Sequence, residues 1–168
     1  MRMAITDALL PEYDHELATT RRLLARVPDA ELGWKPHEKS FTLGELAGHV
    51  AHIPFWCTTT VQTTVFDVDT LGEAARVKAP ESTAAMLAAF DTAVADARGA
   101  LAGCSDSEMM APWTLKAGGQ EIFTMPKIAA IRSFVMNHLI HHRGQLTVYL
   151  RLKDVPLPSI YGPTADEP

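Results

Sequence analysis

The sequence predicts an all-α protein, a four-helix bundle with a small β-hairpin between the third and the fourth helix. Four long stretches carry apolar residues at helical spacing, and one short stretch between the last two has the pattern of paired strands. Proline or glycine stands at several of the expected helix boundaries. Because amphipathic helices bury their apolar sides against one another, four of them favour a bundle.

The first helix is predicted over residues 6–27. Leu10, Leu17 and Leu24 recur at helical spacing, and Pro28 ends the pattern. One side of this helix therefore belongs to the expected core, and a short linker leads from it to the next helix.

The second helix is predicted over about residues 43–66. Thr42 and Glu45 have the spacing of a capping box, in which each side chain accepts a hydrogen bond from the other residue's backbone N–H. Pro54 lies inside this helix and removes one backbone donor, which predicts a kink. Residues 67–79 are expected to form a connection.

The third helix is predicted over residues 82–103, an alanine-rich stretch with high intrinsic helicity. Residues 113–115 and 121–124 are strand-like and flank a turn with two glycines, which is a hairpin pattern. The fourth helix is predicted over residues 126–153, with a proline in its first turn. Four prolines after it predict an irregular C-terminal segment.

Composition limits the classes of protein. The 168 residues fit one domain, residues 1–168, with 47% apolar content for its core. The net charge of −5 and the scattered basic residues argue against a nucleic-acid surface. The N-terminus lacks the apolar region of a signal peptide, and no apolar run of about 18 residues predicts a membrane span. Cys57 and Cys104 stand far apart, as in a reduced, cytoplasmic protein.

Three of the histidines lie close together on the fourth helix. At about 100° per residue, His138 and His142 fall within the apolar stripe, one turn apart. His141 falls about 60° to the other side, at the edge of the stripe. Gln145 falls about 20° beyond His138 on that side, close enough to orient a ligand. The HxxxH pair therefore faces the core.

His49 lies within the apolar stripe of the second helix, whereas His52 falls about 60° towards its edge. His49, His138 and His142 are therefore all expected to point into the core. Three neutral imidazoles can form one face of a divalent metal site and leave a position for water or substrate. Glu45, one turn before His49, serves either the helix cap or the orientation of such a ligand.

The same histidines admit a structural interpretation. A core histidine is more often a hydrogen-bonded packing residue than a ligand, and an HxxxH pair also occurs by chance. Burying three imidazoles without partners is costly, however, and a shared metal removes that cost. His15 and His37 are predicted at the surface, and Cys57 is predicted to pack in the core.

Three segments carry a family resemblance: FTLGELAGHVAHIPFW, then NHLIHHRGQLTVYLR after a long gap, then VPLPSIYGPTADE. Together with Trp34-Lys35-Pro36 they span essentially the whole chain, and HHRGQ and YGPTADE are the more specific motifs. The sequence resembles the DinB family, the DNA-damage-inducible, DinB/YfiT-like group of metalloenzymes, and not the polymerase that shares the name.

The resemblance implies a four-helix bundle, often a homodimer, with a divalent metal held by His49, His138 and His142. Members of the family include transferases and isomerases that use small thiols such as bacillithiol or mycothiol, and many members have no assigned activity. Nitrogen ligands suit zinc and nickel first, with manganese, iron or copper in other geometries.

Three function classes remain open. The first is a metal-dependent enzyme that activates a thiol or a water on a small-molecule substrate, a thiol-dependent S-transferase or a hydrolase. The second is a metal-binding or ligand-binding stress protein without turnover, and the third is a structural dimer whose histidines only pack. For the enzyme, a low-molecular-weight thiol is the expected partner. Arg143 and Arg151 are candidates for an anionic substrate, and Arg143 is equally a candidate for an interhelix contact.

Overall fold

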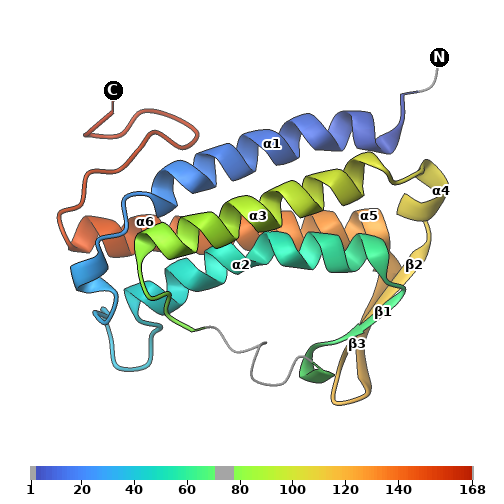
Figure 1. The fold of residues 1–168 in the computed structure, drawn as a ribbon, viewed down its shortest axis with the longest axis horizontal. Coiled ribbons are helices and arrows are strands. Elements are labelled where there is room, and N and C mark those ends of the chain that lie inside the picture. The colour runs from blue at the N-terminus through green and yellow to red at the C-terminus, as the bar shows by residue number, and fades with distance from the viewer. Residues whose placement is uncertain (1–2, 71–77, 168) are drawn as a thin grey trace.

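This computed structural model of the chain describes residues 3–70 and 78–167, which are mostly helical with a small three-stranded sheet at one end (Figure 1). The long helical segments are α1 (Ile5–Leu24), α2 (Leu43–Gln62), α3 (Thr83–Ala102) and the consecutive α5 (Lys127–Ala130), η3 (Ile131–Asn137) and α6 (His138–Leu152). These segments lie lengthwise, and each contacts at least two of the others. The prediction of a mainly helical fold is confirmed.

α2 begins as predicted, with a capping box. Thr42 Oγ1 accepts a hydrogen bond from the Glu45 N–H at 3.1 Å, and the Glu45 carboxylate accepts one from the Thr42 N–H at 2.7 Å. The helix ends at Gln62 rather than at Phe66, because the next residues form strand β1 (Val65–Asp67). β-branched and aromatic residues favour that extended backbone.

Two other boundaries differ from the prediction. α1 ends at Leu24 rather than at residue 27, and a 3-10 turn, η1 (Asp29–Glu31), follows it. A short helix, α4 (Asp106–Met109), which the sequence pattern did not predict, precedes the hairpin. Residues 71–77 of the predicted connection lie outside the described residues.

The predicted hairpin is confirmed, with β2 (Pro112–Ala117) antiparallel to β3 (Gln120–Pro126). β1 pairs in parallel with β2 and gives the strand order β1-β2-β3. Gly118 and Gly119 have φ of 56° and 78°, which a tight hairpin turn needs and which glycine adopts without strain. The parallel strand was missed because its partner is distant in sequence.

The predicted fourth helix is one uninterrupted run that contains a π-helical stretch. This stretch, Ile131–Asn137, ends directly before His138. π-helical turns are rare and frequent at functional sites. A helical wheel drawn at about 100° per residue therefore holds from His138 to His142 but not across the π-helical stretch.

The core lies between the long helical segments and is apolar. Its buried members include Leu9, Tyr13, Leu17, Leu46, Val50, Ile53, Met86, Phe90, Leu101, Val135, Leu139, Leu146 and Leu150. A smaller cluster beside the sheet contains Trp113, Leu115 and Ala130. The Trp113 Nε1–H donates to Thr63 Oγ1 at 3.0 Å, which ties the sheet to the end of α2. In the described parts of the chain, no helix combines the length and hydropathy that a bilayer crossing requires.

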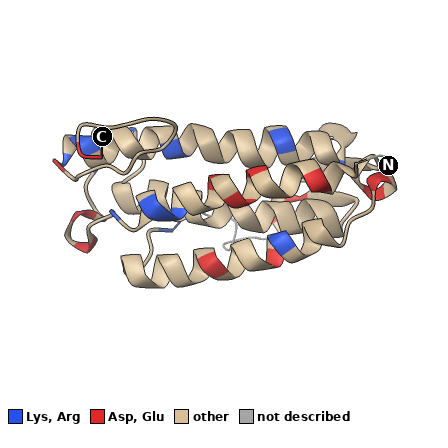
Figure 2. Ribbon diagram, turned by 90° about the horizontal axis from the view of Figure 1, so that it is seen from above, with Lys and Arg blue, Asp and Glu red and all other residues tan. Residues whose placement is uncertain are grey.

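Acidic and basic residues are interspersed along the helices (Figure 2). Arg21 pairs with Asp91 at 2.7 Å and Arg98 pairs with Asp14 at 2.8 Å, so both pairs join α1 to α3. Such exposed ion pairs contribute little to stability, and the apolar core therefore carries most of the helix packing.

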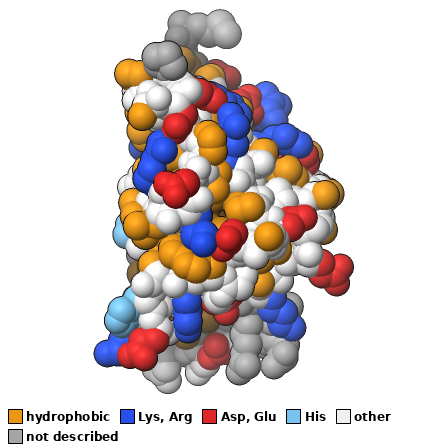
Figure 3. All heavy atoms as spheres, turned by 90° about the vertical axis from the view of Figure 1, so that its left-hand side faces the viewer, with side chains coloured by type: hydrophobic (Ala, Val, Ile, Leu, Met, Phe, Trp, Pro, Cys, Tyr) orange, Lys and Arg blue, Asp and Glu red, His pale blue; other side chains and the backbone are white. Residues whose placement is uncertain are grey.

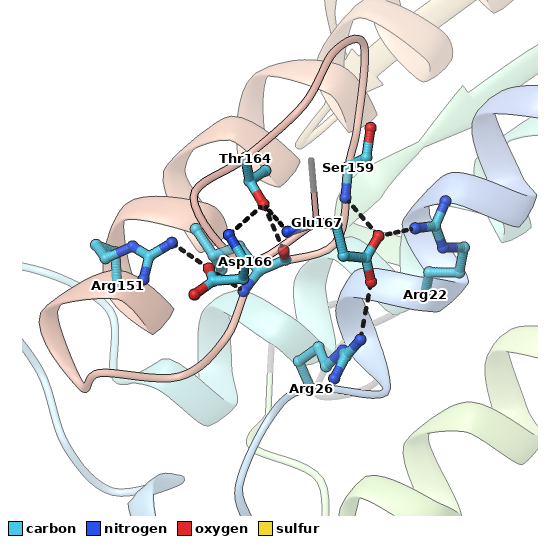
Figure 4. Close-up of polar contacts among 8 residues, drawn as sticks. Arg22, Arg26, Arg151, Ser159, Thr164, Asp166 and Glu167 are labelled. Atoms are coloured by element: carbon cyan, nitrogen blue, oxygen red, sulfur yellow. Dashed lines mark hydrogen bonds and ion pairs between the residues drawn. The ribbon is translucent and has the colours of Figure 1, made fainter.

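The C-terminal segment after α6 is irregular, as predicted, and it folds back along α1 and α6 (Figure 4). Glu167 accepts hydrogen bonds from Arg22 of α1 and from Arg26, which follows that helix, and Asp166 pairs with Arg151 of α6. Charged and apolar side chains alternate over this end of the molecule (Figure 3). Ion pairs thus hold a segment that has no regular structure of its own.

A buried ion pair joins α6 to α1. Arg143 Nη2 lies 2.7 Å from Glu16 Oε2, and the two side chains are 2% and 7% exposed. Arg143 Nη1 donates to the Glu16 carbonyl at 3.1 Å and to Thr20 Oγ1 at 3.2 Å. The Tyr161 hydroxyl accepts from Arg143 at 2.6 Å and donates towards the Glu16 carboxylate oxygens at 2.8 and 2.9 Å. Arg143 is therefore an interhelix partner.

We expect Arg143→Met to lower the free energy of unfolding by about 3–5 kcal/mol, because the Glu16 carboxylate stays buried without its counter-charge. Urea unfolding followed by circular dichroism measures the change. The matched control is Arg151→Met, which removes an exposed pair and should change stability little. Equal losses in both variants would contradict this assignment.

Candidate metal centre

α2 and α6 lie in contact and bring three histidines together. His49 comes from the second turn of α2, His138 is the first residue of α6, and His142 lies one turn further. All three side chains are half-buried. The structure thus gathers the three histidines that the helical wheels place towards the core.

The three rings converge rather than stack. Nε2 of His49 lies 3.2 Å from Nε2 of His138. The ring centroids of His49 and His142 are 4.5 Å apart, and those of His138 and His142 are 4.6 Å apart, with interplanar angles of 90° and 60°. One ring nitrogen of each histidine lies within 4.8 Å of the other two. The nitrogens therefore point at a common region.

Two hydrogen bonds orient the rings of α6. His142 Nδ1 lies 2.7 Å from Gln145 Oε1, and because an amide oxygen only accepts, the imidazole donates. The backbone of Phe134 hydrogen-bonds the His138 ring. The His142 ring, whose Nδ1–H is engaged by Gln145, has its Nε2 lone pair available to a ligand.

Burial keeps the imidazoles neutral. The pKa of His49 is lowered from 6.5 to about 4, first by burial and then by the neighbouring charges of His142 and His138. Burial also lowers the pKa of His138 and His142, while their bonds to Phe134 and Gln145 oppose that shift. At neutral pH each ring offers a lone pair, as a metal ligand must.

This donor set fits a divalent metal ion. Nitrogens at about 2.0–2.1 Å from a tetrahedral zinc lie about 3.3–3.4 Å from one another. The 3.2 Å between the Nε2 atoms of His49 and His138 is close to that spacing. The third nitrogen, within 4.8 Å of both, needs to move by at most about 1.5 Å. Three such ligands leave a coordination position open.

The remaining histidines lie outside the cluster. His15, His37, His52 and His141 are exposed, which confirms their predicted placement at the surface or at the stripe edge. The His52 ring stacks on Phe55 at 5.0 Å.

Two alternatives left open by the sequence are resolved. The Glu45 carboxylate bonds the Thr42 N–H and so serves the helix cap, whereas Gln145 contacts His142 as an orienting residue. Cys57 and Cys104 are both buried free cysteines, so the predicted packing role of Cys57 is confirmed.

Aromatic residues around the cluster were not predicted from the sequence. The Phe134 ring lies 6.0 Å from His138 and 5.2 Å from Trp56, and the Phe41 ring lies 6.4 Å from His49. Phe134 stands four residues before His138, a spacing that places the two on one helix face. That spacing was the one signal in the sequence that could have placed Phe134 beside His138. Phe134 lies in the π-helical stretch, however, where α-helical spacing does not apply.

Comparison with known proteins decides the family. The family model of the DinB superfamily matches residues 12–146, which include all three histidines. The chain belongs to the DinB superfamily. The uncharacterized protein YrdA of Bacillus subtilis (strain 168) is 27% identical over 169 residues, which cover 96% of this chain and 90% of YrdA.

Solved DinB-like structures share the fold of this DinB-superfamily chain. A DinB-like protein from Bacillus cereus ATCC 10987 superposes with a TM-score of 0.71 at 22% identity, covering 96% of this chain and all of the other. The DinB-like protein YjoA from Bacillus subtilis gives 0.69 at 17% identity, over 92% and 99% of the two chains. At these identities the likeness shows the fold alone.

The free energy of unfolding of the metal-free protein should fall as the pH drops from about 6.5 towards 4. His49 titrates near 6.5 when unfolded and near 4 when folded, so in this window the unfolded chain binds more protons and gains stability. Urea unfolding at about pH 7 and about pH 5 should show a loss that is smaller in His49→Gln by about 1 kcal/mol or more. Identical losses would contradict the burial of a neutral His49.

Proposed function

We propose that this protein is a metal-dependent enzyme that activates a thiol or a water at His49, His138 and His142. Its reaction class would be thiol-dependent S-transfer or hydrolysis of a small molecule. The observation that carries the proposal is the convergence of three neutral, half-buried imidazoles from two helices, at ligand-like spacing. A shared ion would bind the converging ring nitrogens and offset the cost of burying them together.

A divalent ion bound by three neutral ligands would lower the pKa of a bound water or thiol and supply a nucleophile at neutral pH. The residues of the chain would position that chemistry. Gln145 holds the His142 ring through Nδ1, and the Phe134 backbone holds the His138 ring. The rings of Phe41 and Phe134 lie beside the histidines and would limit the access of water.

The thiol of such a reaction would come from outside the protein. Burial raises the pKa of Cys57 to about 12 and also raises that of Cys104. Neither thiol is therefore ionised at neutral pH, and a thiolate is the form that reacts. This favours a low-molecular-weight thiol as the partner in S-transfer.

Zinc or nickel is the proposed metal, with manganese or iron as further candidates, because imidazole ligands suit these ions. We also propose that the chain is a single domain with the four-helix-bundle arrangement of its family, acting as a homodimer in the cytoplasm. The two free cysteines suit such a reducing compartment.

Elemental analysis of protein purified without an affinity tag or chelators tests the site. Wild type should retain close to one divalent metal per chain and His142→Ala should lose it, because two imidazoles remain. His141→Ala is the matched control: it removes the neighbouring exposed histidine and should keep the metal. Equal and negligible metal in all three, even after zinc or nickel is supplied, would refute the proposal.

Activity assays on the metal-loaded protein then distinguish an enzyme from a metal-binding protein without turnover. Consumption of a thiol with a small electrophile, or hydrolysis of a small ester or amide, in wild type and not in His142→Ala supports the enzyme. Stable metal binding without turnover of either kind would instead indicate a binding protein of the stress response.

Gln145→Leu should weaken metal binding about 10–100-fold, because the His142 ring loses the acceptor that fixes its orientation. Competition with a chromophoric zinc chelator measures the affinity. An unchanged affinity, with His141→Ala again as control, would show that Gln145 does not orient His142.

A further inference from the structure

A cavity of about 250 Å³ lies beside the histidine cluster. Its described lining consists of Lys39, Ser40, Phe41, Leu46, Gln145 and Tyr149, together with His142. Ligand pockets for drug-sized molecules occupy about 300–1,000 Å³. This cavity therefore suits a small metabolite, or one end of a larger one, in contact with a proposed metal ligand.

Lys39 is the only charged side chain among these lining residues, apart from the titratable but neutral His142. Its ammonium forms no ion pair or hydrogen bond with another residue of the described chain. The nearby carboxylate of Glu45 does not line the cavity and is engaged by the Thr42 N–H. Lys39 is exposed, and a positive charge at the mouth of the cavity without a counter-charge favours an anion.

The surrounding structure holds the cavity wall in place. The Lys39 N–H donates to His37 Nδ1 at 3.2 Å, and the Ser40 N–H donates to the His37 carbonyl at 3.0 Å, so a turn fixes the backbone here. Tyr149, another lining residue, packs its ring edge-on against Trp34, with the ring centroids 5.9 Å apart. Because the cavity wall is preorganised, less conformational entropy is lost when a ligand binds.

We propose that this cavity binds the carboxylate of the small molecule on which the site acts, with Lys39 as the residue that selects it. The inference rests on the proposed function and names its substrate class: a short-chain acid that carries a thiol, or another metal-binding group, at its other end. Phe41 and Leu46 suit the short aliphatic part between the two ends. The charge of a divalent ion, which three imidazoles do not cancel, adds to the attraction of the anion.

Two thiols of similar length test this directly. 3-Mercaptopropionate carries a carboxylate where 3-mercapto-1-propanol carries a hydroxymethyl group. Their affinities for cobalt-loaded protein follow from the thiolate-to-cobalt absorption and from calorimetry. Wild type should bind the acid about tenfold more tightly, as expected for a charge-assisted hydrogen bond.

The variants isolate Lys39. In Lys39→Gln the preference for the acid should fall to the part that the charge of the ion alone contributes. In Lys39→Arg, which keeps the charge, it should stay at the wild-type level. Lys116→Gln, an equal change in net charge on strand β2 away from the cavity, should also keep it. The proposal is overturned if wild type shows no preference, if Lys39→Gln keeps it in full, or if neither thiol binds.

The metal content of each sample, measured first, separates this inference from the proposed function. Protein that takes up no metal refutes the function. Titration of the metal-free protein with sodium succinate, followed by NMR, then still tests whether the cavity binds an anion. Saturable shifts at residues 39–41 in wild type and not in Lys39→Gln support the anion site, and their absence in wild type overturns it.

Discussion

The buried pair between Arg143 and Glu16 is the interaction on which the placement of α6 depends. An uncompensated charge in this position is expensive, so α6 and α1 must meet in the one register that satisfies both groups. Tyr161 completes the network and draws the C-terminal segment over it. His142 immediately precedes Arg143, at about 100° around the helix. Fixing Arg143 towards α1 therefore turns His142 towards α2.

The histidine cluster follows from that register. With α6 fixed, His138 and His142 meet His49 across the contact between α6 and α2. The π-helical stretch ends at His138 and leaves the backbone of Phe134 in reach of its ring. On α6, the ion pair of Arg143 therefore faces α1, whereas His138 and His142 face α2. The cavity at Lys39 is lined by His142 and so lies on the side of the histidines.

Local patterns in the sequence predicted much of this. The Thr42–Glu45 cap, the hairpin and the core-facing side of each of the three histidines all follow from spacing within one element, where helix or strand geometry is regular. Features that depend on partners distant in sequence were missed or left open. Strand β1 was missed because it pairs with β2, far along the chain. The pairing of Arg143 with Glu16 was left open because it depends on how α6 packs against α1. The π-helical stretch has no simple sequence signature. That the three histidines bind a metal stays a prediction.

X-ray absorption spectroscopy of the zinc-loaded protein tests the central claim most directly, because it counts the ligands around the ion. Three imidazole nitrogens at about 2.0–2.1 Å, with at least one further light-atom ligand, are the predicted result. A shell that contains sulfur, or fewer than two imidazoles, would contradict a site built from His49, His138 and His142.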